Sequence, residues 1–333
     1  MKIDFNDLTL VPEIISEINS RRECNVYRDG KLPIMTAPMF DVIDDNNVSL
    51  FSGIGMITIS PRNSWGWLDT LKKSKIHFDF QAFGLDEEIP QSFKTSKHGI
   101  LIDIANGHMR KLIKRIKFIK KEFPNCPLMV GNIANPKTFI QLSLAGADYV
   151  RCGIGGGTAC TTSANVGVHY PMASLIQETY ELKKLHGLNT KIVADGGMKN
   201  YSDIIKALAL GADYVMLGGI ISKSYESSAE KFMYKEGNYT PYNGTYNDSL
   251  EIYSKYSGMS TKLSQKKMGN HKLKTGEGVT RYLKVEYSIY GWVENFTDYL
   301  RSAMSYTNSL NLDSFKECEK VVISQNAFKR FDK

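Results

Sequence analysis

The stretch Gly153–Thr162 reads Gly-Ile-Gly-Gly-Gly-Thr-Ala-Cys-Thr-Thr and places a cysteine and two threonines directly after a run of glycines. Glycines adopt backbone angles that other residues avoid and let a ligand approach the main chain closely. Such a loop can therefore bind an anion or a cation through its NH and CO groups, with Cys160 as the attacking atom. The competing interpretation is a glycine-rich turn before a buried structural cysteine, because a free cysteine usually acts as a small hydrophobic residue.

Composition restricts the class of protein. A chain of 333 residues with 42% hydrophobic content can bury a large core, and it contains no clear linker. No run of about 18 apolar residues occurs, and Met1–Asp7 lacks the apolar core of a signal peptide, so we expect a cytoplasmic protein that does not bind membranes. Five scattered cysteines without a Cys-x-x-Cys pair argue against disulfides and zinc. The net charge of +7 suits anionic small molecules as well as nucleic acid.

The elements that position the cysteine loop follow a regular pattern. Short apolar runs alternate with segments of helical periodicity, which is typical of βα units around a parallel sheet. Eight strands are predicted: Ile34–Ala37, Gly55–Ser60, Phe78–Phe83, Ile100–Ala105, Leu128–Ile133, Tyr149–Gly153, Lys191–Ala194 and Tyr214–Gly218. Eight near-continuous apolar strands favour an α/β fold closed into a (β/α)8 TIM barrel over an open sheet.

A repeat supports this interpretation. Gly146–Val150 and Gly211–Val215 are both Gly-Ala-Asp-Tyr-Val, and each follows a predicted helix, Pro136–Leu144 or Ser202–Leu210. One βα module is therefore used twice. The very basic segment Arg110–Lys121 has apolar residues on one helical face, so we expect its charges to form the solvated face rather than a nucleic-acid site.

In such a barrel, chemistry takes place in the loops after the C-terminal ends of the strands. Glycine or polar residues follow five of the predicted strands: Asp103, Asn106 and Gly107; Gly131 and Asn132; the Cys160 loop; Asp195, Gly196 and Gly197; and Gly218 and Gly219. A nucleoside monophosphate needs amide donors for its phosphate and a carboxylate for its ribose hydroxyls. Asp-Gly-Gly alone is more often a turn, so the inference depends on all five strand ends together.

Eight segments in one order resemble the IMP dehydrogenase/GMP reductase family. The resemblance runs from about Phe5 to Leu310 and is carried by Asp103–Gly107, Gly131–Asn132, Gly153–Thr162, Gly167–Pro171, Ala194–Gly197, Val215–Gly219, Tyr256–Ser260 and Glu277–Gly278. It implies a purine nucleoside monophosphate as substrate and a homotetramer. It also implies a single catalytic barrel domain over residues 1–333 with short terminal extensions and a mobile flap within residues 220–275.

The resemblance also implies roles for individual residues. Cys160 is the nucleophile at purine C2, and Thr162 and Glu277 manage the leaving or attacking group. Substrate contacts fall to Asp195 for the ribose hydroxyls, to Thr158, Gly197, Gly218, Gly219 and Tyr256 for the 5′-phosphate, and to Met259 and Ser260 for the base. Cofactor contacts fall to Asp103, Asn106 and Gly107. The carbonyls of Gly155, Gly157 and Cys160 correspond to a site for a monovalent cation such as K⁺.

Four features bear on the branch of the family. Pro61–His77 is too short for the regulatory modules that most IMP dehydrogenases insert there, and Ile102–His108 resembles the reductase wording. Met259–Glu277 contains no arginine, whereas the dehydrogenase activates water with a flap Arg-Tyr pair; Arg281-Tyr282 comes after Glu277. Val279, where reductases usually carry lysine, points the other way.

We therefore predict a GMP reductase, which converts GMP to IMP and ammonia with NADPH through a covalent bond between Cys160 and purine C2. Three alternatives remain open at the level of sequence. They are an IMP dehydrogenase without regulatory modules, converting IMP and NAD to XMP; a purine-nucleotide-binding barrel that has lost turnover; and a flavin-dependent oxidase whose glycine loops bind FMN.

Two departures from the family lead to further expectations. The loop usually contains Gly-Pro-Gly-Ser and an arginine after the two threonines, whereas this chain has Gly156, Thr158 and Ser163. Glycine in place of proline predicts a looser loop, at a cost of about 1 kcal/mol. The six tyrosines of Tyr234–Tyr256 and the five lysines of Lys262–Lys274 predict a long irregular segment, whose rings could stack on the cofactor and whose lysines could meet a 2′-phosphate.

Overall fold

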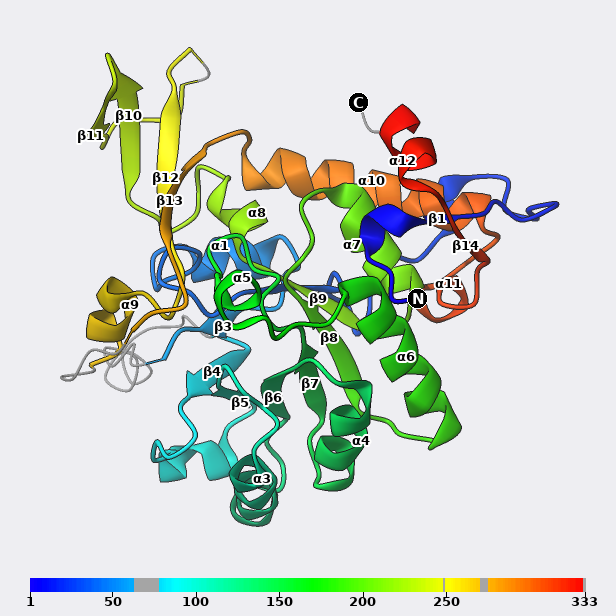
Figure 1. The fold of residues 1–333 in the computed structure, drawn as a ribbon, viewed down its shortest axis with the longest axis horizontal. Helices are drawn as coiled ribbons and strands as arrows, with labels where there is room; N and C mark the ends of the chain where they lie inside the picture. Colours follow the sequence, from blue (N-terminus) through cyan, green and yellow to red (C-terminus); the bar gives the residue numbers. More distant parts are fainter. Residues whose placement is uncertain (63–77, 248, 270–274, 332–333) are drawn as a thin grey trace.

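The computed structural model describes residues 1–62, 78–247, 249–269 and 275–331 (Figure 1). Its helices and strands in chain order are η1 Phe5–Asp7, β1 Leu8–Leu10, η2 Arg21–Glu23, β2 Ile34–Thr36, α1 Val48–Gly53, β3 Ile59–Ser60, β4 Phe80–Phe83, η3 Gln91–Thr95, β5 Gly99–Asp103, α3 Arg110–Glu122, β6 Leu128–Ile133, α4 Pro136–Leu144, β7 Tyr149–Cys152, α5 Thr162–Val166, α6 Met172–Leu185, β8 Lys191–Asp195, α7 Tyr201–Ala209, β9 Tyr214–Leu217, α8 Gly219–Ser222, β10 Lys231–Lys235, β11 Asn238–Pro241, β12 Ile252–Ser257, α9 Lys262–Lys267, β13 Thr280–Lys284, α10 Ile289–Tyr306, α11 Leu312–Phe315, β14 Lys320–Val322 and α12 Gln325–Phe331. Within the described ranges, no helix is both long enough and apolar enough to cross a membrane.

Eight parallel strands form one sheet in the order β2-β9-β8-β7-β6-β5-β4-β3. The sheet closes on itself just before β3, where Ile57 donates its NH to the Ile34 carbonyl at 2.9 Å and accepts from the Thr36 NH at 2.9 Å. Helices α3, α4, α6 and α7 surround the sheet (Figure 1). The predicted (β/α)8 barrel is confirmed, and each of the eight predicted strands overlaps an observed one.

The core has two layers because successive side chains of a strand point to opposite faces of the sheet. In β5, Leu101 belongs to the cluster inside the barrel, whereas Ile100 and Ile102 pack in the outer cluster under the helices. Helix α3 meets this outer layer with Leu112, Ile116 and Ile119, all fully buried, and Phe123 closes the same face. The basic residues of this helix therefore lie on its opposite, solvated face, as the periodicity predicted.

The two copies of the repeated module have the same local structure. Helices α4 and α7 each begin after an asparagine, Asn135 or Asn200, whose side chain accepts an NH of the first turn. The aspartate of each copy then ties its module to the previous strand: Asp148 accepts the Leu128 NH at 2.7 Å, and Asp213 accepts the Ile192 NH at 2.8 Å. The same five residues therefore form the same connection twice.

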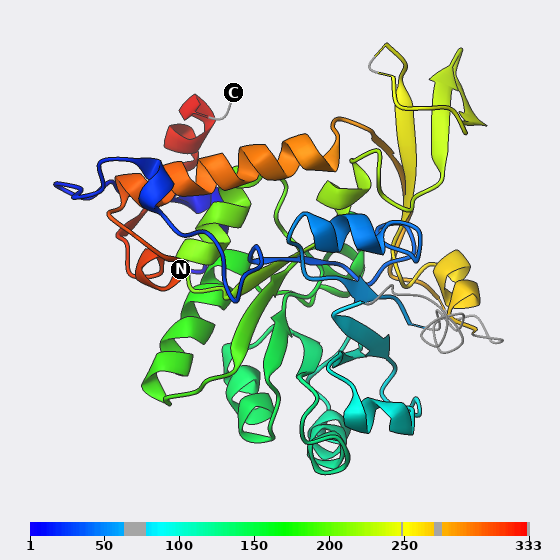
Figure 2. The same cartoon turned by 180° about the vertical axis from the view of Figure 1, so that it is seen from behind.

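Between β9 and α10 the chain leaves the barrel and forms a four-stranded antiparallel sheet, in the order β11-β10-β12-β13, that stands off the barrel in both views (Figures 1 and 2). The expectation of an irregular segment is therefore wrong for the described part of this region. One tyrosine from each strand packs in a common ring cluster, and the rings of Tyr239 and Tyr282 are stacked at 4.0 Å between centroids. The predicted lysines Lys272 and Lys274, and residues 63–77 of the short connection, lie outside the described residues.

The two ends of the chain meet at the barrel. Strand β1 pairs with β14 in an antiparallel two-stranded sheet, with Leu8 opposite Val322. Helix α10 runs along one side of the molecule between the projecting sheet and this pair (Figure 2). Its apolar face, including Trp292, Phe296 and Leu300, is buried.

Candidate active site

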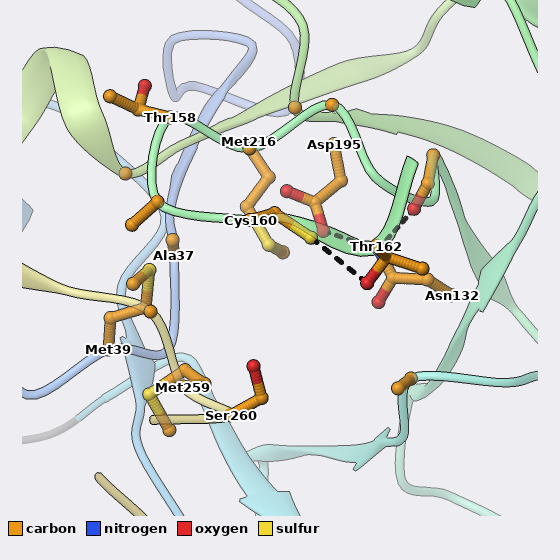
Figure 3. Close-up of a pocket in the computed structure, with 18 of the residues that line it drawn as sticks. Ala37, Met39, Asn132, Thr158, Cys160, Thr162, Asp195, Met216, Met259 and Ser260 are labelled. Atoms are coloured by element: carbon orange, nitrogen blue, oxygen red, sulfur yellow. Dashed lines mark hydrogen bonds between the residues drawn. The ribbon is translucent and has the colours of Figure 1, made fainter. Parts of the chain in front are cut away.

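A cavity of about 550 Å³ lies at the C-terminal ends of the barrel strands, where loops from several βα units converge (Figure 3). Its volume is in the range of small-molecule and cofactor sites. Most of the residues predicted from the sequence line it: Asp103, Gly155, Gly157, Thr158, Cys160, Thr162, Asp195, Gly197, Gly218, Gly219, Tyr256, Met259, Ser260 and Glu277. The structure therefore brings together segments that are far apart in the chain.

Two predicted cofactor residues, Asn106 and Gly107, do not line the cavity. The Asn106 side chain accepts the backbone NH of His108 at 3.0 Å and so closes a turn. Gly107 donates its NH to the Asn132 carbonyl at 2.7 Å, and a Cβ there would lie 2.7 Å from that same oxygen. Both residues shape the loop beside the cavity, while Asp103 is the member of the predicted set that faces it.

Cys160, Thr162 and Glu277 form a chain of hydrogen bonds. The Cys160 thiol donates to Thr162 Oγ1 at 3.3 Å, and that hydroxyl donates to Glu277 Oε2 at 2.5 Å. Figure 3 shows the Cys160 sulfur directed at the Thr162 hydroxyl. A thiol, a hydroxyl and a carboxylate joined in this way can pass a proton between the sulfur and a group bound in the cavity.

Backbone pairing holds Glu277 in this arrangement. Thr161 donates its NH to the Glu277 carbonyl at 2.8 Å, and Val279 donates to the Ala159 carbonyl at 3.0 Å. Gly258 lies beside the same contact, because a Cβ there would be 2.7 Å from the Ala159 carbonyl oxygen. The connection between β12 and β13 is therefore joined directly to the cysteine loop.

The other end of the cavity is lined by glycines that allow two hydroxyls to approach closely. A Cβ on Gly219 would lie 2.6 Å from Thr158 Oγ1, and a Cβ on Gly218 would lie 2.6 Å from the Tyr256 hydroxyl. Tyr256 is buried, and burial raises the pKa of its hydroxyl, so the group stays protonated and can donate. The Tyr256 hydroxyl donates to the weak acceptor Met39 Sδ at 3.2 Å, and together with Thr158 Oγ1 and the half-buried glycine backbone it offers groups that suit a phosphate.

Asp195 is held from one side only. Its Oδ2 accepts from Asn132 Nδ2 at 2.6 Å and from Arg151 Nη2 at 2.7 Å and Nε at 3.2 Å. Its Oδ1 receives no donor from the residues that the structure describes. One carboxylate oxygen is therefore fixed and the other remains available to a hydroxyl of a ligand.

Arg151 is a site residue that sequence reasoning missed. It projects from β7 between two carboxylates: its Nη1 lies 2.5 Å from Asp103 Oδ1, and its Nη2 lies 2.7 Å from Asp195 Oδ2. Burial alone would lower the pKa of this guanidinium, but the two carboxylates raise it, so it remains charged. The signal was an arginine inside an otherwise apolar strand, since a buried charge requires partners.

Arg62 was also missed, because it follows β3, for which the sequence showed no ligand pattern. Its guanidinium lines the cavity, donates to the Asp103 carbonyl at 2.9 Å and contacts Met268 Sδ at 3.4 Å. Within the described residues it forms no ion pair. An unneutralised cation in this part of the cavity favours an anionic ligand group.

The two cysteines of this region differ in environment. Cys160 is half-buried at the cavity, whereas Cys152 is fully buried in β7. Burial raises the pKa of the Cys152 thiol, which keeps it protonated. Position and access thus distinguish the candidate nucleophile from the structural cysteine.

The architecture and the cavity define a (β/α)8 barrel with a nucleotide-sized site around a cysteine. A family model described as IMP dehydrogenase / GMP reductase domain matches residues 87–330. The chain is 34% identical to a GMP reductase of Vibrio vulnificus (strain YJ016) and to one of Vibrio parahaemolyticus, in each case over 94% of this chain and 91% of the relative. A GMP reductase of Vibrio atlanticus is 28% identical over 94% of the chain and 92% of the relative. The chain belongs to the IMP dehydrogenase/GMP reductase family.

Proposed function

We propose that this protein is a GMP reductase that converts GMP to IMP and ammonia with NADPH. The observation that carries the proposal is the hydrogen-bonded chain Cys160–Thr162–Glu277 in a nucleotide-sized cavity. The GMP reductase relatives, which align with nearly the whole chain, support the same choice.

In this mechanism the thiolate of Cys160 adds to C2 of the purine. The 2-amino group leaves as ammonia, with protons delivered along Thr162 and Glu277. NADPH, when bound, supplies the hydride that C2 receives as the bond to Cys160 breaks. The sum is GMP, NADPH and two protons giving IMP, NADP⁺ and ammonium, and Cys160 returns to its starting state.

We propose that the other residues of the cavity bind the substrate before the reaction begins. The free Oδ1 of Asp195 would accept the ribose hydroxyls, and Thr158, Gly197, Gly218, Gly219 and Tyr256 would surround the 5′-phosphate. Met259 and Ser260 would meet the base through their backbone groups. These residues orient the nucleotide so that C2 faces Cys160.

The side chains of Arg62 and Asp103 fit a nicotinamide dinucleotide. The Arg62 guanidinium, which has no carboxylate partner among the described residues, suits a phosphate, and Asp103 Oδ2, which no described donor reaches, suits a ribose hydroxyl. Arg62 and Asp103 would hold the cofactor there and exclude water from the reacting face of the purine.

One observation favours the alternative, an IMP dehydrogenase. A guanidinium at Arg62 lines the cavity, and the dehydrogenases of this family use an arginine to activate water. The arginine-tyrosine pair at Arg281 and Tyr282 does not supply one, since both residues belong to β13 and neither lines the cavity. Reductase chemistry needs no activated water, so we place the reductase first.

The test is nicotinamide absorbance in two parallel assays, GMP with NADPH and IMP with NAD. We expect turnover in the first and none in the second. The reverse pattern would replace the reductase by the dehydrogenase, and nucleotide binding without turnover in either assay would indicate a binding protein. A yellow purified protein would indicate a flavin enzyme instead.

The proposal includes a setting for the enzyme: one catalytic domain over residues 1–333, a cytoplasmic location and a homotetramer without nucleic-acid partners. Light scattering coupled to size-exclusion chromatography tests the tetramer. A monomeric mass with full activity would remove it from the proposal.

A further inference from the structure

The carbonyl oxygens of residues 155–157 all accept hydrogen bonds from the protein itself. The three bonds are Ser163 Oγ to the Gly155 carbonyl at 3.1 Å, Gly197 NH to the Gly156 carbonyl at 2.9 Å and Cys160 NH to the Gly157 carbonyl at 2.9 Å. The donors come from α5, from the loop after β8 and from the cysteine loop. The glycine run is therefore held from three directions.

The contact between Gly155 and Ser163 requires a glycine. Gly155 has a φ of +82°, and a Cβ there would lie 2.9 Å from the Cβ of Ser163. Because no side chain intervenes, the half-buried serine hydroxyl reaches the carbonyl. The glycine at position 155 and the serine at position 163 are therefore both needed for this hydrogen bond.

Gly156, for which the sequence predicts a looser loop, packs directly against the loop after β8. A Cβ at Gly156 would lie 2.9 Å from the Gly197 backbone nitrogen, so only glycine allows the two loops to approach this closely. The Gly197 NH then fixes the Gly156 carbonyl. Because Gly156 has no side chain, the Gly197 NH can reach the loop. This hydrogen bond offsets the conformational entropy that the glycine loop loses when it is ordered.

A monovalent cation orders a carbonyl-rich loop by neutralising oxygens that point toward one another. In this chain two of the three predicted cation ligands, the carbonyls of Gly155 and Gly157, already face protein donors. Each of these carbonyls therefore already has a protein partner, and these hydrogen bonds hold the glycine run in the way that a cation would. Ser163 stands at the position where the family commonly has arginine, and its hydroxyl supplies one of these donors.

We propose that Ser163 orders the Cys160 loop in place of a monovalent cation and is a positioning residue for the nucleophile. The proposal depends on the proposed function only for its activity readout. Its consequence is that GMP reduction by the wild type is the same in potassium chloride and in tetramethylammonium chloride at equal ionic strength.

The experiment uses Ser163→Ala with Asn165→Ala as a control on the same helix. The Asn165 side chain is exposed and makes no hydrogen bond with the described residues. Alkylation of Cys160 by iodoacetamide is followed by mass spectrometry, with half-buried Cys318 in the same sample as reference. Loss of one neutral hydrogen bond predicts alkylation about fivefold faster in Ser163→Ala and amide exchange of residues 155–160 accelerated by a similar factor.

The measured rates decide the proposal. Cation-independent wild-type alkylation, exchange and turnover, with a faster Ser163→Ala and an unchanged Asn165→Ala, support it. Wild-type rates that change tenfold between the two salts would overturn it, as would a Ser163→Ala protein identical to the wild type. If GMP and NADPH give no turnover, the proposed function fails, but alkylation and exchange still test the role of Ser163.

Discussion

The carboxylates at the two ends of the barrel differ in how many of their oxygens already have a partner in the protein. At the C-terminal end, Asp195 and Glu277 line the cavity and keep oxygens open to a ligand. At the N-terminal end, Asp213 has a side chain only 2% exposed, and both oxygens are used: Oδ1 by Lys316 at 2.7 Å, and Oδ2 by Lys183 at 2.8 Å and the Ile192 NH at 2.8 Å.

The difference indicates that the C-terminal end binds and converts the ligand, whereas the N-terminal end stabilises the fold. A carboxylate with an open oxygen can exchange partners with a ligand, whereas a buried carboxylate with every partner in place can only lose them. Substitutions at the first end should therefore change binding or turnover, and those at the second should change the free energy of unfolding.

The largest effect is expected for Cys160→Ser. Serine is close in size, so GMP binding should change little, but its hydroxyl is a much weaker nucleophile and turnover should fall by at least about 10³-fold. Calorimetry with GMP and the NADPH assay measure the two separately. Cys152→Ala is the matched control and should keep its rate; a dead Cys152→Ala with an active Cys160→Ser would refute the covalent mechanism.

Asp213→Asn should have the next largest effect, but on folding. It leaves the Lys183 ammonium without its carboxylate partner and leaves Lys316 with only the exposed Asp313 carboxylate at 3.4 Å, at a cost of about 3–5 kcal/mol. Urea unfolding measures the loss, and kcat/KM of the folded variant should match the wild type. Asp148→Asn is the control from the other copy of the repeat: its side chain is 42% exposed, so about 1 kcal/mol or less is expected. Equal losses at both positions would contradict the role of burial.

Asp195→Ala should weaken GMP binding by about 10- to 100-fold, because it removes charge-assisted hydrogen bonds of about 1.5–3 kcal/mol. Calorimetry measures the affinity and urea unfolding checks that the fold is kept. An unchanged affinity for GMP would show that the ribose is bound elsewhere.

The smallest effect concerns acid stability. Burial alone would raise the pKa of Asp213, but the ammonium groups of Lys316 and Lys183 lower it to about 2. A carboxylate with a lowered folded pKa stabilises the protein above its unfolded pKa, here near 4, and this contribution of about 2 kcal/mol is lost as the pH falls toward 2. Urea midpoints measured from pH 5 downward should therefore fall more steeply in the wild type than in Asp213→Asn. Parallel curves would contradict this assignment.

Much of the fold followed from the sequence because buried parallel strands are apolar throughout and end in glycine or polar residues. The helix Pro136–Leu144 was predicted with its observed bounds, since Asn135 and Pro136 mark its start. The projecting sheet was not predicted. Its strands contain tyrosine and lysine rather than a clear apolar alternation, and their pairing depends on partners distant in sequence.

The candidate site was predicted where residues lie next to recognisable loops and missed where a long side chain crosses the barrel. The hydrogen bond from Thr162 to Glu277 joins residues 115 positions apart, and the resemblance rather than any local pattern brought them together. Arg151 was missed because only the closed barrel reveals which strand residues point into the cavity, and Arg62 was missed because it follows β3, where the sequence shows no ligand pattern. The donors that hold the glycine run also lie outside what spacing can predict.

The pairing of β1 with β14 has a consequence for how this chain is made. Leu8–Leu10 is translated before the eight barrel strands, but its partner Lys320–Val322 is translated only after them. The first strand must therefore wait with its backbone NH and CO groups unpaired while the barrel assembles beside it. Completion of this two-stranded sheet is a late event of biosynthesis, and pulse-labelled nascent chains halted before β14 should remain sensitive to protease at their N-terminal segment.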